Sequence, residues 1–260
     1  MPDAEKLPLP PPPLVAPPEF VERARQFRAG GMPVAPAKPS ATVMLLRDID
    51  GHLEVFMIRR QTTMLFAGGM HVFPGGGIDP VDRDGRAIDD ALVITAIRET
   101  FEESGVLLAS GEPAEEAALE ADRVALVEHR LTFDGLLARH GFVAQPHWLR
   151  RWSRWITPDF EPRRYDTHFF VALARPGQEA RDMGGESDAA EWVAPAKALA
   201  AQEKHEWLLM PPTAVTLHEL LPFTNAAEVF DAAEARSFLP RHADVDLDAD
   251  PPMFVFRTTT

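Results

Sequence analysis

The sequence of 260 residues contains no cysteine. This absence excludes disulfide bonds, thiolate metal ligands and cysteine nucleophiles, and it agrees with a reducing compartment. The sequence also has no apolar run long enough to cross a bilayer, and its first residues do not follow the basic-then-apolar order of a secretory signal. We therefore expect a cytoplasmic protein that does not insert into a membrane.

Positive charge is scarce, because 26 lysines and arginines stand against 40 aspartates and glutamates and give a formal net charge of -14. Such a surface repels nucleic acid and anionic lipid. Unless a local basic patch overrides this repulsion, neither a nucleic acid nor a membrane is expected as a partner. The length and the hydrophobic content of 45% are sufficient for one large domain with a real core.

Proline is unevenly distributed, since residues 1–40 hold 11 of the 25 prolines, including the run "PLPPPPLVAPP". Such a run favours an extended polyproline II conformation and cannot form a packed core. We predict a proline-rich tail over residues 1–39, flexible or lying on the surface, with one short helix in "PEFVERARQFRAGG". The alternative is a docking ligand for a proline-reading partner. The domain itself is expected over residues 40–260.

The start of this domain shows three strand patterns followed by a helix pattern. "ATVMLLRD" and "EVFMIRRQ", joined by "IDGH", predict a β-hairpin, and "MHVFPGGG" predicts a third strand that ends in a glycine turn at Gly75–Gly76. "DDALVITAIRETFEESG" predicts a helix that begins with Asp89 or Asp90 as its cap and ends before Gly105.

The remainder of the chain alternates between the two patterns. Strands are expected in "VLLAS", "RRYDTHFFVALA" and "AAEWVAP", and three helices are expected to close the chain. Residues 112–155 predict a helical insertion, which either shapes a pocket as a lid, covers one face of the domain or contacts a second copy in a homodimer. Strands interleaved with helices favour an α/β layered fold.

Three glutamates share one face of the predicted helix. At 100° per residue, Glu99, Glu102 and Glu103 fall within an arc of roughly 100°, opposite an apolar stripe. Like charges at this spacing repel one another, and the negative end of the helix dipole disfavours them further. A hard divalent cation such as Mg²⁺ removes the repulsion, and it is commonly held by carboxylates together with substrate phosphates. The alternative is a solvated acidic face.

The residues around this helix resemble the signature of the Nudix hydrolases. The family pattern is a glycine, five residues, a glutamate, seven residues, and then Arg-Glu-U-x-Glu-Glu-x-Gly-U, where U is bulky and aliphatic. The matching positions are Arg98, Glu99, Glu102, Glu103, Gly105 and Val106, whereas Thr100 departs at the first U. The family glycine corresponds to Gly76. Counting back seven residues from Arg98 gives Asp90 in place of the glutamate, so we expect an insertion of about eight residues, "VDRDGRAI", before Asp90.

The resemblance implies an α/β/α sandwich with a mixed β-sheet, to which the helical insertion is added. It also implies an enzyme that cleaves a diphosphate joining a nucleoside to another moiety, by attack of water with Mg²⁺ or Mn²⁺. Glu102 and Glu103 would be metal ligands, with Glu99 a ligand or the general base. The backbone carbonyl of Gly76 would approach the metal, and Arg98 would orient the carboxylates.

A general base can also come from outside the signature. Glu186, in the glycine-bearing loop "MGGESD", is the candidate here, and an ordinary loop acid is the alternative reading.

Other features are similar to the branch of the family that includes the peroxisomal coenzyme A diphosphatase. They are the inserted loop, the "HVFPGG" lead-in, "RRYDTHFF" and "PPT". A coenzyme A signature of bacterial relatives is matched at Arg60 and Gly69 but not at Gln61 and Leu65. The branch favours coenzyme A or acyl-coenzyme A as substrate. The alternatives are ADP-ribose or a nucleotide sugar, or a non-catalytic module that binds nucleotides.

Cations and aromatic rings elsewhere supply the candidate substrate contacts. Arg60 and Arg164 are expected to bind phosphates through paired hydrogen bonds, with a surface salt bridge as the alternative for each. Aromatic side chains that could stack on a base, or else belong to the core, are Trp152, Trp155, Tyr165 and Phe169.

Overall fold

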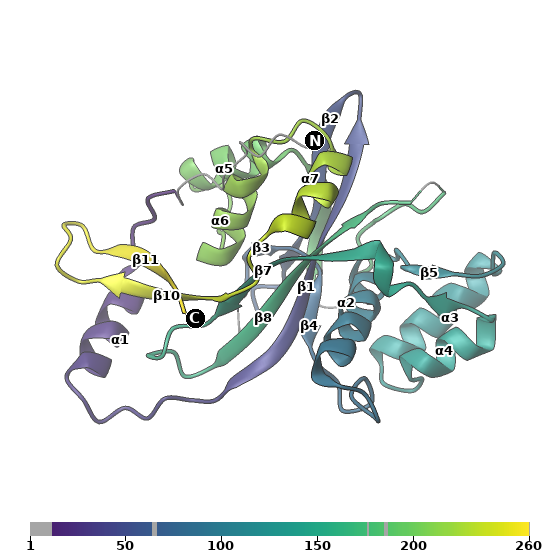
Figure 1. Ribbon diagram of the computed structural model, residues 1–260, viewed down its shortest axis with the longest axis horizontal. Coiled ribbons are helices and arrows are strands. Elements are labelled where there is room, and N and C mark those ends of the chain that lie inside the picture. Colours follow the sequence, from purple (N-terminus) through teal and green to yellow (C-terminus); the bar gives the residue numbers. More distant parts are fainter. Residues whose placement is uncertain (1–11, 64–66, 176, 185–186, 260) are drawn as a thin grey trace.

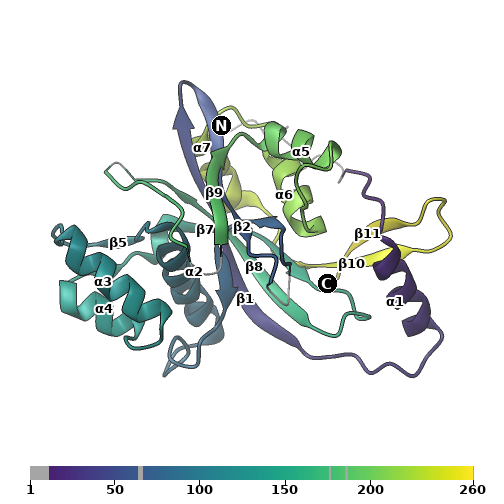
Figure 2. The same ribbon diagram turned by 180° about the vertical axis from the view of Figure 1, so that it is seen from behind.

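The computed structural model describes residues 12–63, 67–175, 177–184 and 187–259. Its centre is a mixed sheet whose strands follow the order β11-β10-β7-β8-β1-β2-β3, where β3 is His71–Val72 (Figure 1). In addition, β4 pairs with β1, and β9 (Ser187–Val193) pairs with β2. The sheet runs diagonally through the molecule and has helices on both faces, as the view from behind also shows (Figure 2). The expected α/β/α sandwich with a mixed sheet is confirmed.

The hairpin of β1 (Ala37–Ile49) and β2 (His52–Arg60) lies at the middle of this sheet, as predicted. Asp50 and Gly51 turn the chain with φ of 50° and 77°, as a two-residue hairpin turn requires. On its other side β1 pairs in parallel with β8 (Arg164–Leu173). Because both faces of β1 are covered, its side chains alternate between two hydrophobic cores.

Each of the two cores belongs to one layer of helices. The first core lies beneath α5 (Pro195–Glu203), α6 (Pro211–Leu220) and α7 (Ala226–Ala232). The second lies beneath α2 (Ile88–Ser104), α3 (Glu116–Val127) and α4 (Phe133–His140). Within the part of the chain that the structure describes, no helix combines the length and the apolar character needed to span a bilayer.

Helix α2 carries the predicted glutamates. It ends as expected, because Gly105 adopts φ of 76° and its N–H bonds to Phe101 O at 2.9 Å. Its start differs from the prediction, since Ala87 is the N-cap and no side chain caps the helix. Asp89 and Asp90 lie inside the first turn, where acidic side chains favour the positive end of the helix dipole.

The expected helical insertion over residues 112–155 is correct only in its first part. After α3 and α4, residues 146–148 form a 3₁₀ turn and Leu149–Ile156 form strand β7. This strand pairs with β8 and β10 in the middle of the sheet. A register shift between Arg151 and Ser153 places Trp152 and Ser153 both in buried positions. This bulge breaks the alternation by which a strand is recognised.

The two ends of the described chain pack together. Helix α1 (Pro18–Arg28) forms as predicted, and β10 (Pro240–Asp246) and β11 (Met253–Thr258) form a hairpin beside it (Figure 1). Their shared core is small and consists of Ala16, Val21, Ala24, Phe160, Val245 and Phe254. Residues from Ala16 onward are therefore built into the fold, and β1 begins at Ala37. The expectation that helices close the chain is wrong, because β10 and β11 follow them.

Candidate active site

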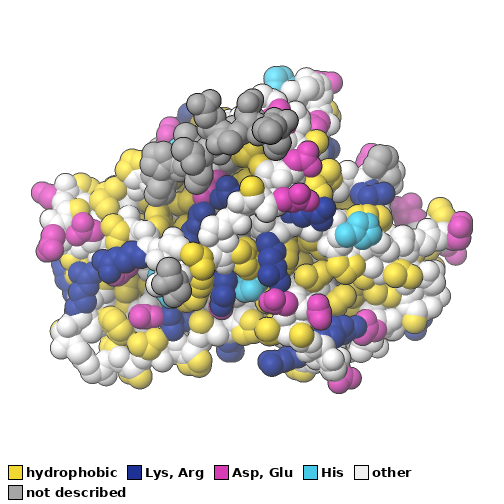
Figure 3. Space-filling view, viewed as in Figure 1, with side chains coloured by type: hydrophobic (Ala, Val, Ile, Leu, Met, Phe, Trp, Pro, Cys, Tyr) yellow, Lys and Arg dark blue, Asp and Glu magenta, His cyan; other side chains and the backbone are white. Residues whose placement is uncertain are grey.

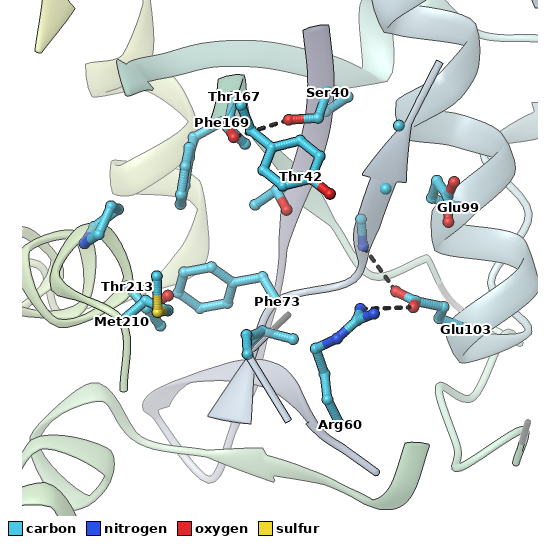
Figure 4. A pocket seen from close by; sticks show the side chains of 18 of the residues that line it. Ser40, Thr42, Arg60, Phe73, Glu99, Glu103, Thr167, Phe169, Met210 and Thr213 are labelled. Carbon is cyan, nitrogen blue, oxygen red and sulfur yellow. Dashed lines mark hydrogen bonds and ion pairs between the residues drawn. The ribbon is translucent and has the colours of Figure 1, made fainter. Parts of the chain in front are cut away.

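A cavity of about 720 Å³ extends along the sheet beside β1 and β8. The carboxylate face of α2 forms one wall, where Glu99 and Glu103 lie beside Gly75–Gly77, the strand β4 (Figure 4). Phe73, Phe169 and Met210 lie on the opposite side in the same view. The cavity thus joins a charged wall to an apolar one.

The fold brings most of the predicted site residues to this cavity. The predicted residues that line it are Arg60, Gly76, Arg98, Glu99, Glu102 and Glu103. Arg164 is not among them: its guanidinium donates to the carbonyls of Thr157 and Ala35 and pairs with Asp159. Arg164 therefore holds the chain around β8 together and is not placed to bind a substrate here. Glu186 lies outside the described residues.

Arg98 organises the carboxylates. Its side chain is buried, and Nη1 lies 2.8 Å from Glu99 Oε1 and 3.0 Å from Glu102 Oε1. Nη2 donates to Gly77 O at 3.1 Å. Burial disfavours the charged guanidinium, but the surrounding carboxylates outweigh it and raise the pKa of Arg98 above its ordinary value. The orienting role implied by the resemblance agrees with this geometry.

Asp82 completes the set around Arg98, although the sequence analysis did not select it. Asp82 is buried, and its Oδ2 accepts hydrogen bonds from Arg98 Nε at 2.9 Å and Thr95 Oγ1 at 3.0 Å. It stands six positions after Gly76, the spacing of the glycine and glutamate in the family pattern. The assignment of Asp90 to that position is wrong, because Asp90 is exposed. Counting forward from Gly76 would have found Asp82, and it places the insertion between Asp82 and α2.

The three glycines of β4 allow close approach of the backbone. They form a strand paired with β1, not the expected glycine turn. A Cβ atom on Gly76 would lie 2.3 Å from Glu99 Oε1, and one on Gly75 would lie 2.2 Å from Thr42 Oγ1. Glycine is therefore required at Gly75 and Gly76 for its small size. Because there is no side chain at Gly76, its backbone lies against the carboxylate of Glu99.

Glu103 is held from the other side. The N–H of Gly75 donates to Glu103 Oε2 at 2.8 Å, and Arg60 Nη1 lies 4.0 Å from Glu103 Oε1 (Figure 4). These contacts direct Glu103 toward β4 and β2, away from the carboxylate pair that Arg98 holds. The wall therefore presents its carboxylates at separate, fixed positions.

The chemistry of this wall fits a hard divalent cation. Burial raises the pKa of Glu102 against the opposing effect of Arg98, so part of the energetic cost of its charge is uncompensated. The available donors are carboxylate oxygens and the backbone of β4, which are the oxygen ligands that Mg²⁺ and Mn²⁺ accept. As they stand, no three acidic or histidine side chains among the described residues are arranged to hold a metal ion. A cation would therefore have to draw the glutamates away from their present contacts.

The opposite end of the cavity is aromatic. Trp155, Tyr165 and Phe169 all line it, whereas Trp152 is fully buried in the core and donates its Nε1–H to Glu219 at 2.9 Å. Between the two ends, Ser40 Oγ and Thr167 Oγ1 are 2.8 Å apart on neighbouring strands (Figure 4). Outside the cavity, basic side chains are interspersed with acidic ones on the face seen in Figure 3.

Comparisons with known proteins agree with this geometry. The family model described as the NUDT19 Nudix domain matches residues 83–220. The crystal structure of a NUDIX hydrolase from Alicyclobacillus acidocaldarius superposes with a TM-score of 0.64 at 30% identity, covering 76% of this chain and 96% of that one.

Two relatives with curated names match over part of their length. The acyl-coenzyme A diphosphatase NUDT19 of Gallus gallus is 31% identical over 170 residues, which are 56% of this chain and 45% of the relative. A nudix hydrolase of Caenorhabditis elegans is 30% identical over 172 residues, which are 64% of this chain and 55% of the relative. The chain thus spans about half the length of the curated relatives it matches.

Proposed function

The chain belongs to the Nudix hydrolase family, and from this premise we propose that it is a metal-dependent diphosphatase whose substrate is coenzyme A or acyl-coenzyme A. The observation that carries the proposal is the arrangement of Glu99, Glu102 and Glu103 on one wall of a cavity whose other wall is apolar. The charged wall suits a diphosphate with its cation, and the apolar wall suits an uncharged chain attached to it. The name of the relative from Gallus gallus, an acyl-coenzyme A diphosphatase, supports the choice of substrate.

A bound Mg²⁺ or Mn²⁺ would neutralise the diphosphate and lower the pKa of a water molecule that attacks phosphorus. Glu102 and Glu103 would hold the cation, with the carbonyl of Gly76 as a further oxygen donor. Glu99 would either join them or accept the proton of the attacking water. Glu186 remains a second candidate for that proton.

The remaining residues position these groups. Arg98 keeps Glu99 and Glu102 at fixed places and cannot lose its charge in this surrounding. Arg60, on the adjacent strand β2, would bind a phosphate oxygen once a cation draws Glu103 away. Preorganised charges of this kind stabilise the charge that develops during phosphoryl transfer.

A substrate panel tests the proposal directly. The purified full chain is incubated with Mg²⁺ and either coenzyme A, an acyl-coenzyme A or ADP-ribose, and the products are separated by chromatography. We expect phosphopantetheine or its acyl derivative, together with adenosine 3′,5′-diphosphate. Formation of AMP and ribose phosphate from ADP-ribose, without cleavage of coenzyme A, would replace the proposed substrate. Binding of all three without cleavage would indicate a non-catalytic module.

The metal assignment needs a variant. Glu102→Gln keeps the shape of the side chain but removes its charge, so hydrolysis should fall by about 10³-fold or more while the fold persists. Glu116→Gln is the matched control, because Glu116 is an exposed acid on α3 whose side chain is 83% accessible. Activity of Glu102→Gln equal to that of the control would remove Glu102 from the metal site.

A further inference from the structure

We call the end of the cavity that lies away from the carboxylates the distal arm. Its lining side chains are Phe20, Trp155, Ile156, Pro158, Ala243 and Phe254. They come from α1, β7, the loop after β7, and the β10–β11 hairpin. Phe20, Ala243 and Phe254 lie outside residues 83–220, which match the family model, so the two ends of the chain contribute to this arm.

The register of the sheet gives the length of the cavity floor. Gly77 of β4 pairs with Ser40 of β1, and Ser40 pairs with Thr167 of β8. The row continues from Thr167 to Trp155 of β7 and from Trp155 to Arg241 of β10. Four steps between strands of about 4.8 Å each place β10 roughly 19 Å from β4. The distal arm therefore lies far from the carboxylates but on the same floor.

The walls of the distal arm are apolar and well packed. Phe20 meets Phe254 edge-to-face at 5.3 Å between ring centroids, and Trp155 meets Phe256 at 5.3 Å in the same way. Trp155 is 2% exposed and Phe254 is 8% exposed, so their rings are fixed by the surrounding core. A preformed apolar pocket of this kind binds an apolar group without first being reorganised.

The charged side chains that line the cavity indicate which end of the substrate binds in the distal arm. The charged side chain that lines this end of the cavity is an acid, Glu161, whose Oε1 pairs with Arg23 Nε at 2.8 Å. The nucleotide end of coenzyme A carries a phosphate monoester, which needs cations. Arg60, Arg98 and Arg123, by contrast, line the cavity near the carboxylate end. An uncharged chain is therefore the better match for the distal arm.

We propose that the distal arm, formed by α1, the end of β7 and the β10–β11 hairpin, binds the acyl chain of an acyl-coenzyme A whose diphosphate lies at the carboxylates of α2. The inference rests on the proposed function for the identity of the substrate. It makes the two ends of the chain, not the helical insertion, the determinant of chain-length preference.

The test compares the affinity for decanoyl-coenzyme A with that for coenzyme A, by titration calorimetry of the full chain in EDTA. Both ligands carry the same diphosphate, so the effect of the acyl chain is the ratio of the dissociation constant of coenzyme A to that of decanoyl-coenzyme A. The native protein should bind decanoyl-coenzyme A the more tightly. Phe20→Ala should reduce this ratio about tenfold, since it removes an apolar wall, and leave the affinity for coenzyme A unchanged. Ala243→Leu, which narrows the arm, should also reduce the ratio.

Two controls accompany these variants. Phe27→Ala makes the same substitution on the same helix, in the α1 core but outside the cavity, and should keep the native ratio. Val127→Ala alters the end of the cavity beside α3 and should also keep it. The inference would be overturned if the native protein bound both ligands equally well. It would also be overturned if Phe20→Ala lost the same affinity for both ligands, or if Val127→Ala changed the ratio. Failure of the proposed function is separate, because it is the absence of phosphopantetheine release by the native chain in Mg²⁺.

Discussion

Arg98 Nε lies 2.9 Å from Asp82 Oδ2, and both side chains are buried. Arg98 belongs to α2, whereas Asp82 belongs to the loop that precedes it. The same guanidinium holds Glu99 and Glu102 with Nη1. The contact with Asp82 therefore fixes the position from which Arg98 directs the two carboxylates.

Asp82→Asn should lower both stability and activity. The substitution removes one partner of a buried ion pair, which costs about 3 kcal/mol in free energy of unfolding. It also removes the negative charge that holds Nε of Arg98, so the two carboxylates are oriented less firmly and kcat should fall by roughly tenfold or more. Denaturant unfolding and steady-state kinetics on the same preparation measure the two effects.

Asp90→Asn and Asp84→Asn are the controls for this variant. Both aspartates are exposed, and Asp84 lies in the same loop as Asp82. Each should change the free energy of unfolding by less than about 0.5 kcal/mol. If Asp90→Asn rather than Asp82→Asn impaired the enzyme, the assignment of Asp82 to the family position would be wrong.

Gly76→Ala should abolish activity with a smaller effect on folding. The new methyl group would lie 2.3 Å from Glu99 Oε1, and only the carboxylate can move away. Glu99 would therefore leave the position that Arg98 gives it. Gly77→Ala adds the same group where nothing lies within 4 Å, and it should be the milder variant. Kinetics in Mg²⁺ compare the two, and equal losses would contradict the argument.

The features of the fold and of the site that depend on local spacing were predicted correctly from the sequence. The turn signal at Asp50–Gly51 and the glycine at position 105 are confirmed because their conformations depend on neighbouring residues. The same holds for the carboxylate face of α2. Asp82 was missed because the loop after it has a length that the family pattern does not give. Counting back from Arg98 reaches Asp90 and counting forward from Gly76 reaches Asp82, and the ion pair with Arg98 decides in favour of Asp82.

Strands β7, β10 and β11 could not be recognised in the same way. The alternation of β7 is broken at Trp152 and Ser153, which are both buried. Strand β10 pairs in parallel with β7, which lies far earlier in the sequence, so this pairing leaves no local pattern. The distal arm depends on these pairings and on the packing of α1, so no local pattern indicated it. Arg164 was expected to bind a phosphate, but its guanidinium donates to two backbone carbonyls. The sequence around an arginine does not show which acceptors its donors will reach.

Acid should destabilise the protein through His71. Burial, and to a lesser degree Arg59, lower the pKa of His71 from 6.5 to about 4. The folded state therefore holds the neutral ring, while the unfolded chain takes up a proton below pH 6.5. The contribution of neutral His71 to the free energy of unfolding is fully present above pH 6.5. It is lost as the pH falls toward 4, and the loss amounts to up to about 3 kcal/mol. Denaturant unfolding between pH 7 and pH 4 measures this loss.

His71→Phe isolates this contribution. The ring of His71 stacks on Trp207 with 3.8 Å between centroids, and phenylalanine can keep that contact but cannot be protonated. The variant should lose less stability between pH 6.5 and 4 than the native protein. A part of the slope should remain, because burial also lowers the pKa of His168 to about 4. His52→Phe, at an exposed histidine, should keep the native slope, and an unchanged slope in His71→Phe would exclude its role.

Glu219 should prove essential for attaching the C-terminal hairpin to the sheet. It is 4% exposed, and its two oxygens accept from Arg236 Nη2 at 2.5 Å and Arg241 Nη1 at 2.6 Å. Burial lowers the pKa of Arg236, so its charge is tolerated only beside this carboxylate. Glu219→Gln leaves both guanidinium groups without a charged partner, and the free energy of unfolding should fall by about 3–5 kcal/mol.

Glu234→Gln is the control for this variant. It removes a mostly exposed acid that pairs with Arg150, and it should change the free energy of unfolding by at most about 1 kcal/mol. Because Arg241 lies on β10, Glu219→Gln should also weaken the preference for decanoyl-coenzyme A, whereas a stable variant with the native preference would show that the hairpin does not depend on these ion pairs.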